Sequence, residues 1–156
     1  MKHISIHEFG EQVSALLPKL IRHIYQYEIQ VIARGELTVS KLQFLDCLSE
    51  QKSPTMKDLA EYANLKRPSA TAVADQMTAQ GLISRKAGEK DRRTVFVNLT
   101  EKGRRLHKSI QTERKKGLVN AFKTISAAER TAYLNIIQKL SLNILENKQS
   151  NKTVEI

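Results

Sequence analysis

Two short stretches in the second half of the chain show the residue pattern of a β-hairpin. In residues 94–99, Val95, Val97 and Leu99 alternate with the intervening side chains, which is the period of a half-buried strand. Residues 82–86 form a second short strand-like stretch. The segment between them, 87–93, contains a glycine and is highly charged. We therefore expect an antiparallel hairpin whose tip stands in water.

Helical patterns flank this hairpin on both sides. Before it, Ala70, Val73, Ala74 and Met77 recur at i, i+3, i+4 and i+7, which predicts a helix over about 67–80. After it, Thr100 has the side chain to cap a long helix that runs to about residue 122. A helix, a basic hairpin and a second helix form the core of a winged helix domain.

Further helices are predicted upstream. Residues 5–34 carry apolar side chains at helical spacing, and Pro18 is expected to kink that helix or split it in two. Thr38 is a suitable cap for the next helix, which ends near residue 50. Thr55 and Asp58 resemble a capping box at the start of a short helix over 56–63. That short helix is the expected first helix of a helix-turn-helix.

The last helix begins after another capping box, Ser126 with Glu129. It carries an apolar stripe of six residues: Tyr133, Ile136, Ile137, Leu140, Ile144 and Leu145. The winged helix has no element to cover this stripe or that of the first helix, so we expect a second subunit to cover both. The fold class is mainly α with a small β-hairpin. The predicted domains are an N-terminal dimerisation helix (1–34), a winged helix-turn-helix (35–100), C-terminal dimerisation helices (101–147) and a flexible tail (148–156).

Several motifs of this region resemble the MarR family of bacterial transcriptional regulators. The matching residues are Thr71, Gly81-Leu82-Ile83, Asp91-Arg92-Arg93 and Leu99-Thr100-Glu101-Lys102-Gly103. The most diagnostic feature is the pattern D-x-R a few residues before L-T-x-x-G. The order of the predicted helices extends the resemblance over nearly the whole chain. It implies a homodimeric DNA-binding regulator whose N- and C-terminal helices interlock. It also implies a small-molecule effector of unknown identity that modulates DNA affinity, and a repressor rather than an enzyme.

The charge of the chain is concentrated in the predicted winged helix. The net charge is +10, and residues 52–116 hold 16 Lys and Arg against 7 Asp and Glu, so +9 of that charge lies there. A basic patch confined to one region favours a nucleic-acid partner over a uniformly basic solvated surface.

Five residues near the predicted reading helix are expected to contact DNA: Lys66, Arg67, Ser69, Thr71 and Gln76. The first two stand at the N-terminal end, where the helix dipole also favours phosphate. Ser69 has the alternative of a local backbone hydrogen bond. The family often has an arginine where this chain has Ala72, so a bidentate contact with guanine is missing there. We expect a pseudo-palindromic and A·T-rich operator.

The hairpin tip carries the remaining candidates, Lys90, Arg92 and Arg93. The resemblance implies that the wing, about 87–93, enters the minor groove through Arg93 and that Asp91 braces it. A narrow A·T minor groove has an enhanced negative potential that attracts arginine. The alternative is a surface ion pair between Asp91 and Arg93 without nucleic acid.

Other chemistry is weakly represented. No catalytic motif, phosphate-binding glycine loop or convincing metal site appears, so we expect neither an enzyme nor a cofactor. The single cysteine, Cys47, lies in an apolar helical stretch; a buried thiol and a redox sensor both remain open. A winged helix that binds another protein is a further alternative. With no signal peptide or apolar run of membrane length, the expected location is cytoplasmic.

Overall fold

The computed structural model describes residues 4–33, 35–88 and 94–152. Their helices and strands follow the order α1 (Ile6–Ile24), α2 (Gln26–Ala33), α3 (Val39–Glu50), α4 (Met56–Tyr62), α5 (Arg67–Ala79), β1 (Ile83–Ala87), β2 (Val95–Leu99), α6 (Glu101–Phe122) and α7 (Ala127–Lys152). The chain divides into two compact units, Met1–Gly117 and Leu118–Ile156. The mainly helical fold with one two-stranded hairpin confirms the predicted fold class.

The N-terminal helix is interrupted at a different residue from the one predicted. Pro18 lies inside α1, and the break falls at Tyr25, whose φ of −96° and ψ of 18° separate α1 from α2. The expectation that Pro18 splits the helix is therefore wrong. Proline has no N–H, so the Ser14 carbonyl has no hydrogen-bond donor at Pro18. Both residues are exposed, and water can therefore bond that carbonyl.

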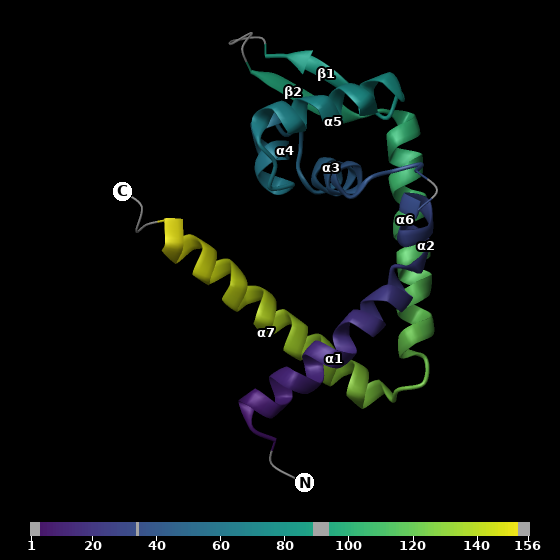
Figure 1. The fold of residues 1–156 in the computed structure, drawn as a ribbon, viewed down its shortest axis with the longest axis vertical. Coiled ribbons are helices and arrows are strands. Elements are labelled where there is room, and N and C mark those ends of the chain that lie inside the picture. Colours follow the sequence, from purple (N-terminus) through teal and green to yellow (C-terminus); the bar gives the residue numbers. More distant parts are fainter. Residues whose placement is uncertain (1–3, 34, 89–93, 153–156) are drawn as a thin grey trace. The chain divides into compact units, whose positions relative to one another are not determined.

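The hydrophobic core of the first unit lies between α3, α4, α5 and the hairpin. Five fully buried side chains form its centre: Phe44, Leu45, Leu59, Met77 and Val97. Figure 1 shows these three helices gathered beside the two strands. The periodicity of the sequence places each of these residues on the apolar face of its own element, so burial follows from packing those faces together.

The hairpin is antiparallel, and the outer edge of its second strand, β2, is bonded to the segment before α4. Residue Ile83 pairs with Leu99, and Ala87 pairs with Val95. The Val97 N–H donates to the Pro54 carbonyl at 2.9 Å, so the segment before α4 covers the free edge of β2. This fixes the base of the wing to the helix-turn-helix.

Helix α6 begins against the start of β1. Thr100 caps it, as predicted, by accepting a hydrogen bond from the Gly103 N–H at 3.1 Å. A Cβ added at Gly103 would collide with the backbone carbonyl oxygen of Leu82. The glycine of the L-T-x-x-G pattern is therefore required because α6 approaches the β1 backbone too closely for a side chain.

A largely buried polar cluster holds α6 against α3. The Asp46 carboxylate of α3 lies 3.0 Å from His107 Nε2 and 3.1 Å from Gln111 Nε2, and 3.5 Å from Arg114 Nη2. His107 is isolated in the sequence, and its partner comes from a segment 61 positions away. These contacts orient the long helix on the winged helix core.

The second unit contains the end of α6 and α7. The predicted capping box is present, since the Ser126 N–H donates to Glu129 Oε2 at 2.8 Å and the Glu129 N–H donates to Ser126 Oγ at 3.3 Å. The predicted helical part ends at residue 147, whereas helix α7 continues to Lys152. This extends the final helix into the predicted tail.

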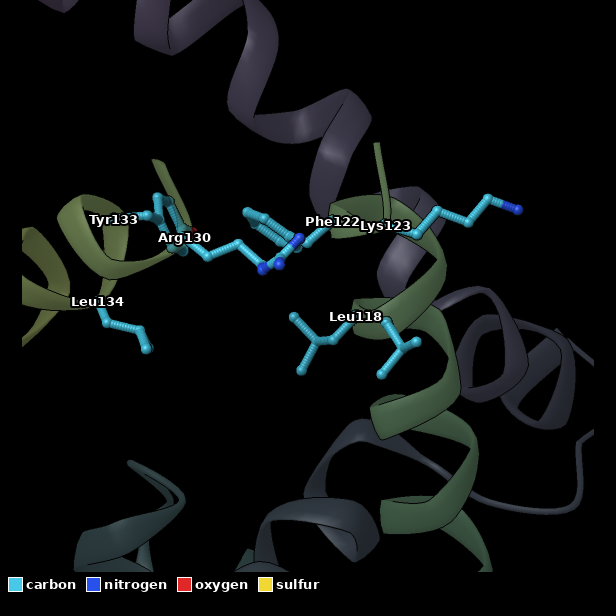
Figure 2. A pocket seen from close by; sticks show the side chains of 7 residues that line it. Leu118, Phe122, Lys123, Arg130, Tyr133 and Leu134 are labelled. Atoms are coloured by element: carbon cyan, nitrogen blue, oxygen red, sulfur yellow. The ribbon is translucent and has the colours of Figure 1, made fainter. Parts of the chain in front are cut away.

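An open apolar cavity lies in the turn between α6 and α7. Its volume is about 460 Å³, and its lining is Leu118, Val119, Phe122, Lys123, Arg130, Tyr133 and Leu134. The ring centroids of Phe122 and Tyr133 are 4.8 Å apart. Both side chains are labelled in Figure 2. The second unit thus has an apolar surface that its own residues leave open.

Candidate nucleic-acid interface

The helix-turn-helix is built from α4, a tight turn and α5. Thr55 accepts a hydrogen bond from the Asp58 N–H, and the Asp58 side chain accepts one from the Thr55 N–H at 2.7 Å, which confirms the capping box. The Asp58 carboxylate accepts hydrogen bonds from the Thr55 N–H and from the Thr55 hydroxyl, and both lower the pKa of Asp58 because they stabilise its charged form. Asn64 has a positive φ of 51° and turns the chain between the two helices.

The start of α5 is open toward solvent. Lys66 precedes the helix in an extended conformation and makes no side-chain cap. Pro68 lies in the first turn, where its missing N–H costs nothing. The remaining unbonded N–H groups of this turn form a site of positive potential, which favours a phosphate at this end of the helix.

The two faces of α5 differ in burial, as its 3.6-residue period dictates. Ala70, Ala74 and Met77 are buried against the core, and Gly81 ends the helix with a φ of 68°. Ala72, Asp75 and Ala79 are exposed on the opposite face. The exposed face is therefore lined by small side chains and one carboxylate.

Four of the five predicted DNA contacts on this helix have free side chains. Lys66, Arg67, Ser69 and Gln76 are exposed, and their side chains make no hydrogen bond or ion pair with the described residues. The Thr71 hydroxyl instead donates to the Arg67 carbonyl at 3.0 Å. The hydroxyl proton of Thr71 is thus used within the helix, and only the hydroxyl oxygen as an acceptor and the methyl group can contact a ligand.

An ion pair that the residue pattern does not predict joins β1 to this helix. Arg85 Nη1 donates to Asp75 Oδ1 at 2.6 Å, and Arg85 Nη2 donates to the Thr71 carbonyl at 3.3 Å. Periodicity places Asp75 on the outward face, but only the packing of β1 on α5 brings Arg85 within reach. The sole sequence signal is that Asp75 is the one acidic residue of α5.

The tip of the hairpin is only partly described. The Gly88 N–H donates to the Thr94 carbonyl at 2.8 Å, which closes the loop at its base. Lys90, Asp91, Arg92 and Arg93 lie outside the described residues, so their roles in the wing remain predictions.

Comparisons with known proteins agree with this architecture. Residues 37–95 match the MarR family model, and this segment spans α3 to the start of β2. Over residues 37–95 the chain is thus similar to the MarR family. It is 31% identical over 83 residues to the homoprotocatechuate degradative operon repressor of Escherichia coli, which covers 53% of this chain and 56% of the repressor. The chain spans between 56% and 64% of the length of the curated relatives it matches.

Solved structures share the fold over most of the chain. A MarR family protein from Bacillus stearothermophilus has a TM-score of 0.78 at 21% identity, with coverage of 90% of this chain and 99% of that one. The structure described as the mechanism for regulation of DNA binding of Bordetella bronchiseptica BpsR by 6-hydroxynicotinic acid has a TM-score of 0.60 at 25% identity. It covers 83% of this chain and 98% of that chain. These likenesses confirm the winged helix fold.

Basic residues at the start of α6 differ in whether their side chains are bonded to the rest of the protein. Lys102 Nζ donates to the Gln80 carbonyl at 2.8 Å, at the end of α5. Arg104 Nη1 donates to the Leu99 carbonyl at 2.8 Å. Arg105 and Lys108 are exposed, and no described residue bonds their side chains. Phosphate contacts from α6 are therefore best sought at the latter two residues.

Cys47 is fully buried in α3. Burial raises the pKa of its thiol to about 11, with the negative charges of Glu50 and Asp58 adding to the shift. A protonated and buried thiol reacts slowly with oxidants, which disfavours the redox alternative. Within the described residues, no group of His, Cys, Asp and Glu side chains is arranged to hold a metal ion. No described helix is long and apolar enough to cross a membrane.

Proposed function

We propose that this chain is a transcriptional regulator that binds double-stranded DNA as a homodimer. The observation that carries the proposal is the exposed face of α5, with Lys66, Arg67, Ser69 and Gln76 free to bind and their helix held rigidly on the core. In this proposal residues 67–80 enter the major groove and the wing, 87–93, enters the adjacent minor groove. The E. coli relative is named as a repressor, which supports repression as the mode of action.

The dimer is supported by apolar surface that each unit leaves exposed. On α1 the exposed fractions of Ile6, Phe9 and Leu16 are 76%, 53% and 62%. On α7 those of Leu134 and Leu140 are 58% and 52%. Exposed apolar side chains in such numbers are costly in water, and a second copy that covers them removes the cost.

A homodimer would present two α5 helices related by a two-fold axis. Such an arrangement reads a pseudo-palindrome with half-sites roughly 10 bp, or about 34 Å, apart. The small outward side chains of α5 and the lack of an arginine at Ala72 favour an A·T-rich half-site, since methyl groups suit thymine.

The effector we propose is a small aromatic carboxylic acid. DNA binding by the Bordetella protein is described as regulated by 6-hydroxynicotinic acid, and the E. coli repressor is named for an operon that degrades homoprotocatechuate, a compound of the same class. A ligand of this class alters DNA affinity only through a difference in its affinity for the two conformations of the dimer.

Salt-dependent DNA binding tests the proposal. We expect purified protein to shift fragments selected from the source genome, with affinity that falls steeply as salt rises, because each neutralised phosphate adds a log–log slope of roughly −0.9. Titration of single-ring carboxylates, with their uncharged amides as controls, then tests the effector class. Absence of DNA binding at low ionic strength would contradict the proposed function.

A further inference from the structure

Arg85 binds α5 at two points that are one helical turn apart. Its guanidinium donates to the Asp75 carboxylate at 2.6 Å and to the Thr71 carbonyl at 3.3 Å. The Arg85 side chain is 28% exposed and the Asp75 side chain is 61% exposed, so the arginine is the more enclosed partner. A planar guanidinium can make both bonds at once, whereas a lysine ammonium lacks the fork geometry.

Asp75 would oppose DNA binding if it were unpaired. It is the single acidic side chain of α5 and stands on the exposed face between Ala72 and Ala79. A carboxylate on a surface that approaches a phosphate backbone is repelled, and the repulsion grows as water leaves the interface. The bond to Arg85 makes the pair electrically neutral and fixes the direction of the carboxylate.

The pair also joins the wing to the reading helix. Arg85 lies in β1, the strand that leads into the wing, and pairs in register with Val97 at the fully buried centre of β2. A bond from this rigid strand to α5 sets the position of the helix relative to the hairpin.

We propose that Arg85 is a positioning residue for DNA binding: it neutralises Asp75 and fixes α5 relative to the wing, and does not itself contact phosphate. This inference rests on the proposed function, because it concerns how the same surface meets DNA. It assigns Asp75 and Arg85 to the binding surface as one unit.

The salt dependence of affinity distinguishes this role from a direct phosphate contact. We expect Arg85→Ala to weaken DNA binding by about tenfold, because Asp75 then faces the phosphates unpaired. This loss shrinks as salt rises, because salt screens the exposed Asp75 charge. Removing that charge as well, in an Arg85→Ala, Asp75→Asn variant, returns the slope of log K against log salt to the wild-type value, whereas loss of a direct phosphate contact would leave the slope reduced by about 1.

Rescue by a second substitution provides the sharper test. In the Arg85→Ala, Asp75→Asn double variant the unpaired charge is gone, and affinity returns to within about threefold of wild type. Arg85→Lys falls between wild type and Arg85→Ala, since an ammonium neutralises Asp75 without bonding Thr71. Lys139→Ala, which removes one positive charge from α7 in the other unit, serves as the matched control and leaves affinity unchanged.

The other outcomes decide whether Arg85 positions α5 or contacts phosphate directly. Thermal unfolding of every variant first shows that it is folded. If wild type binds DNA but Arg85→Ala reduces the slope by about 1 and Asp75→Asn restores nothing, Arg85 is a phosphate contact and the inference is overturned. If wild type binds no DNA, the proposed function and this inference fall together.

Discussion

Arg114 Nε of α6 donates to Glu28 Oε1 of α2 at 2.7 Å, and both side chains are largely buried, with exposed fractions of 20% and 11%. The same guanidinium lies 5.1 Å above the ring of Tyr25, at the break between α1 and α2. One side chain of α6 thus contacts both the second helix and the residue where the first helix ends. We expect this ion pair to be important for stability because its partners are removed from water together.

Removal of Arg114 is expected to destabilise the protein strongly. Arg114→Met leaves the Glu28 carboxylate buried without its partner, which we expect to cost about 3 kcal/mol. Chemical denaturation measures the change. The control is Lys57→Ala on α4, where the exposed pair with Glu61 at 3.7 Å should contribute less than about 0.5 kcal/mol. Equal small effects of both substitutions would contradict the role given to Arg114.

Two glycine substitutions are expected to have opposite effects. Gly103→Ala places a methyl group against the backbone carbonyl of Leu82 and should destabilise the fold by about 1–3 kcal/mol. Gly10→Ala meets no atom within 4 Å inside α1 and should stabilise that helix by up to about 1 kcal/mol. Melting temperatures of the two variants compare them directly. A neutral Gly103→Ala would mean that α6 does not approach β1 this closely.

The Cys47 thiol is expected to be unreactive in the folded protein. With its pKa raised from 9.0 to about 11, the thiolate fraction near pH 8 is lower by about 100-fold than in the unfolded chain. Alkylation by iodoacetamide, followed by mass spectrometry with and without denaturant, measures the difference. Because the pKa of Cys47 is higher in the folded than in the unfolded chain, its contribution to the free energy of unfolding is fully present below about pH 9. That contribution is lost as pH rises toward 11. Rapid alkylation of folded protein would revive the redox alternative.

Loss of the wing arginine is expected to weaken operator binding without unfolding the protein. Arg93→Ala should cost about 1–3 kcal/mol in binding free energy, through loss of the minor-groove contact. A fluorescence anisotropy titration against a selected operator measures this, and an unchanged melting temperature shows that the fold persists. Unchanged affinity would remove the wing from the proposed mechanism.

Deletion of the last helix is expected to abolish the dimer. A chain ended after Thr124 lacks α7 and its exposed apolar side chains, and should sediment as a monomer. A chain ended after Asn147 retains the exposed apolar residues through Leu142 and serves as the control, which should remain dimeric. A dimer formed by the shorter chain would show that α7 is not required for association.

Several elements were predictable from the sequence because their signals are local. Thr38, Thr55, Thr100 and Ser126 each precede a helix that the structure confirms, since a cap depends on groups within a few residues. The buried face of α5 followed from its 3.6-residue period for the same reason.

Contacts between distant segments were not predictable. Asp75 with Arg85, Asp46 with His107 and Glu28 with Arg114 all join residues on different elements, so their partners depend on how those elements pack. The helix break at Tyr25 rather than Pro18 also belongs here, because solvent exposure decides whether water can replace the bond that proline removes.

Most helices, the hairpin, the helix caps and the basic character of the winged helix can be read from the amino-acid order alone, since each depends on neighbouring residues or on composition. Which charges are free and which are paired depends on the folded arrangement, because ion pairs form between side chains of different elements that packing brings together. Arg67 and Arg85 are chemically alike in the sequence, yet folding leaves the first exposed to solvent and binds the second to Asp75.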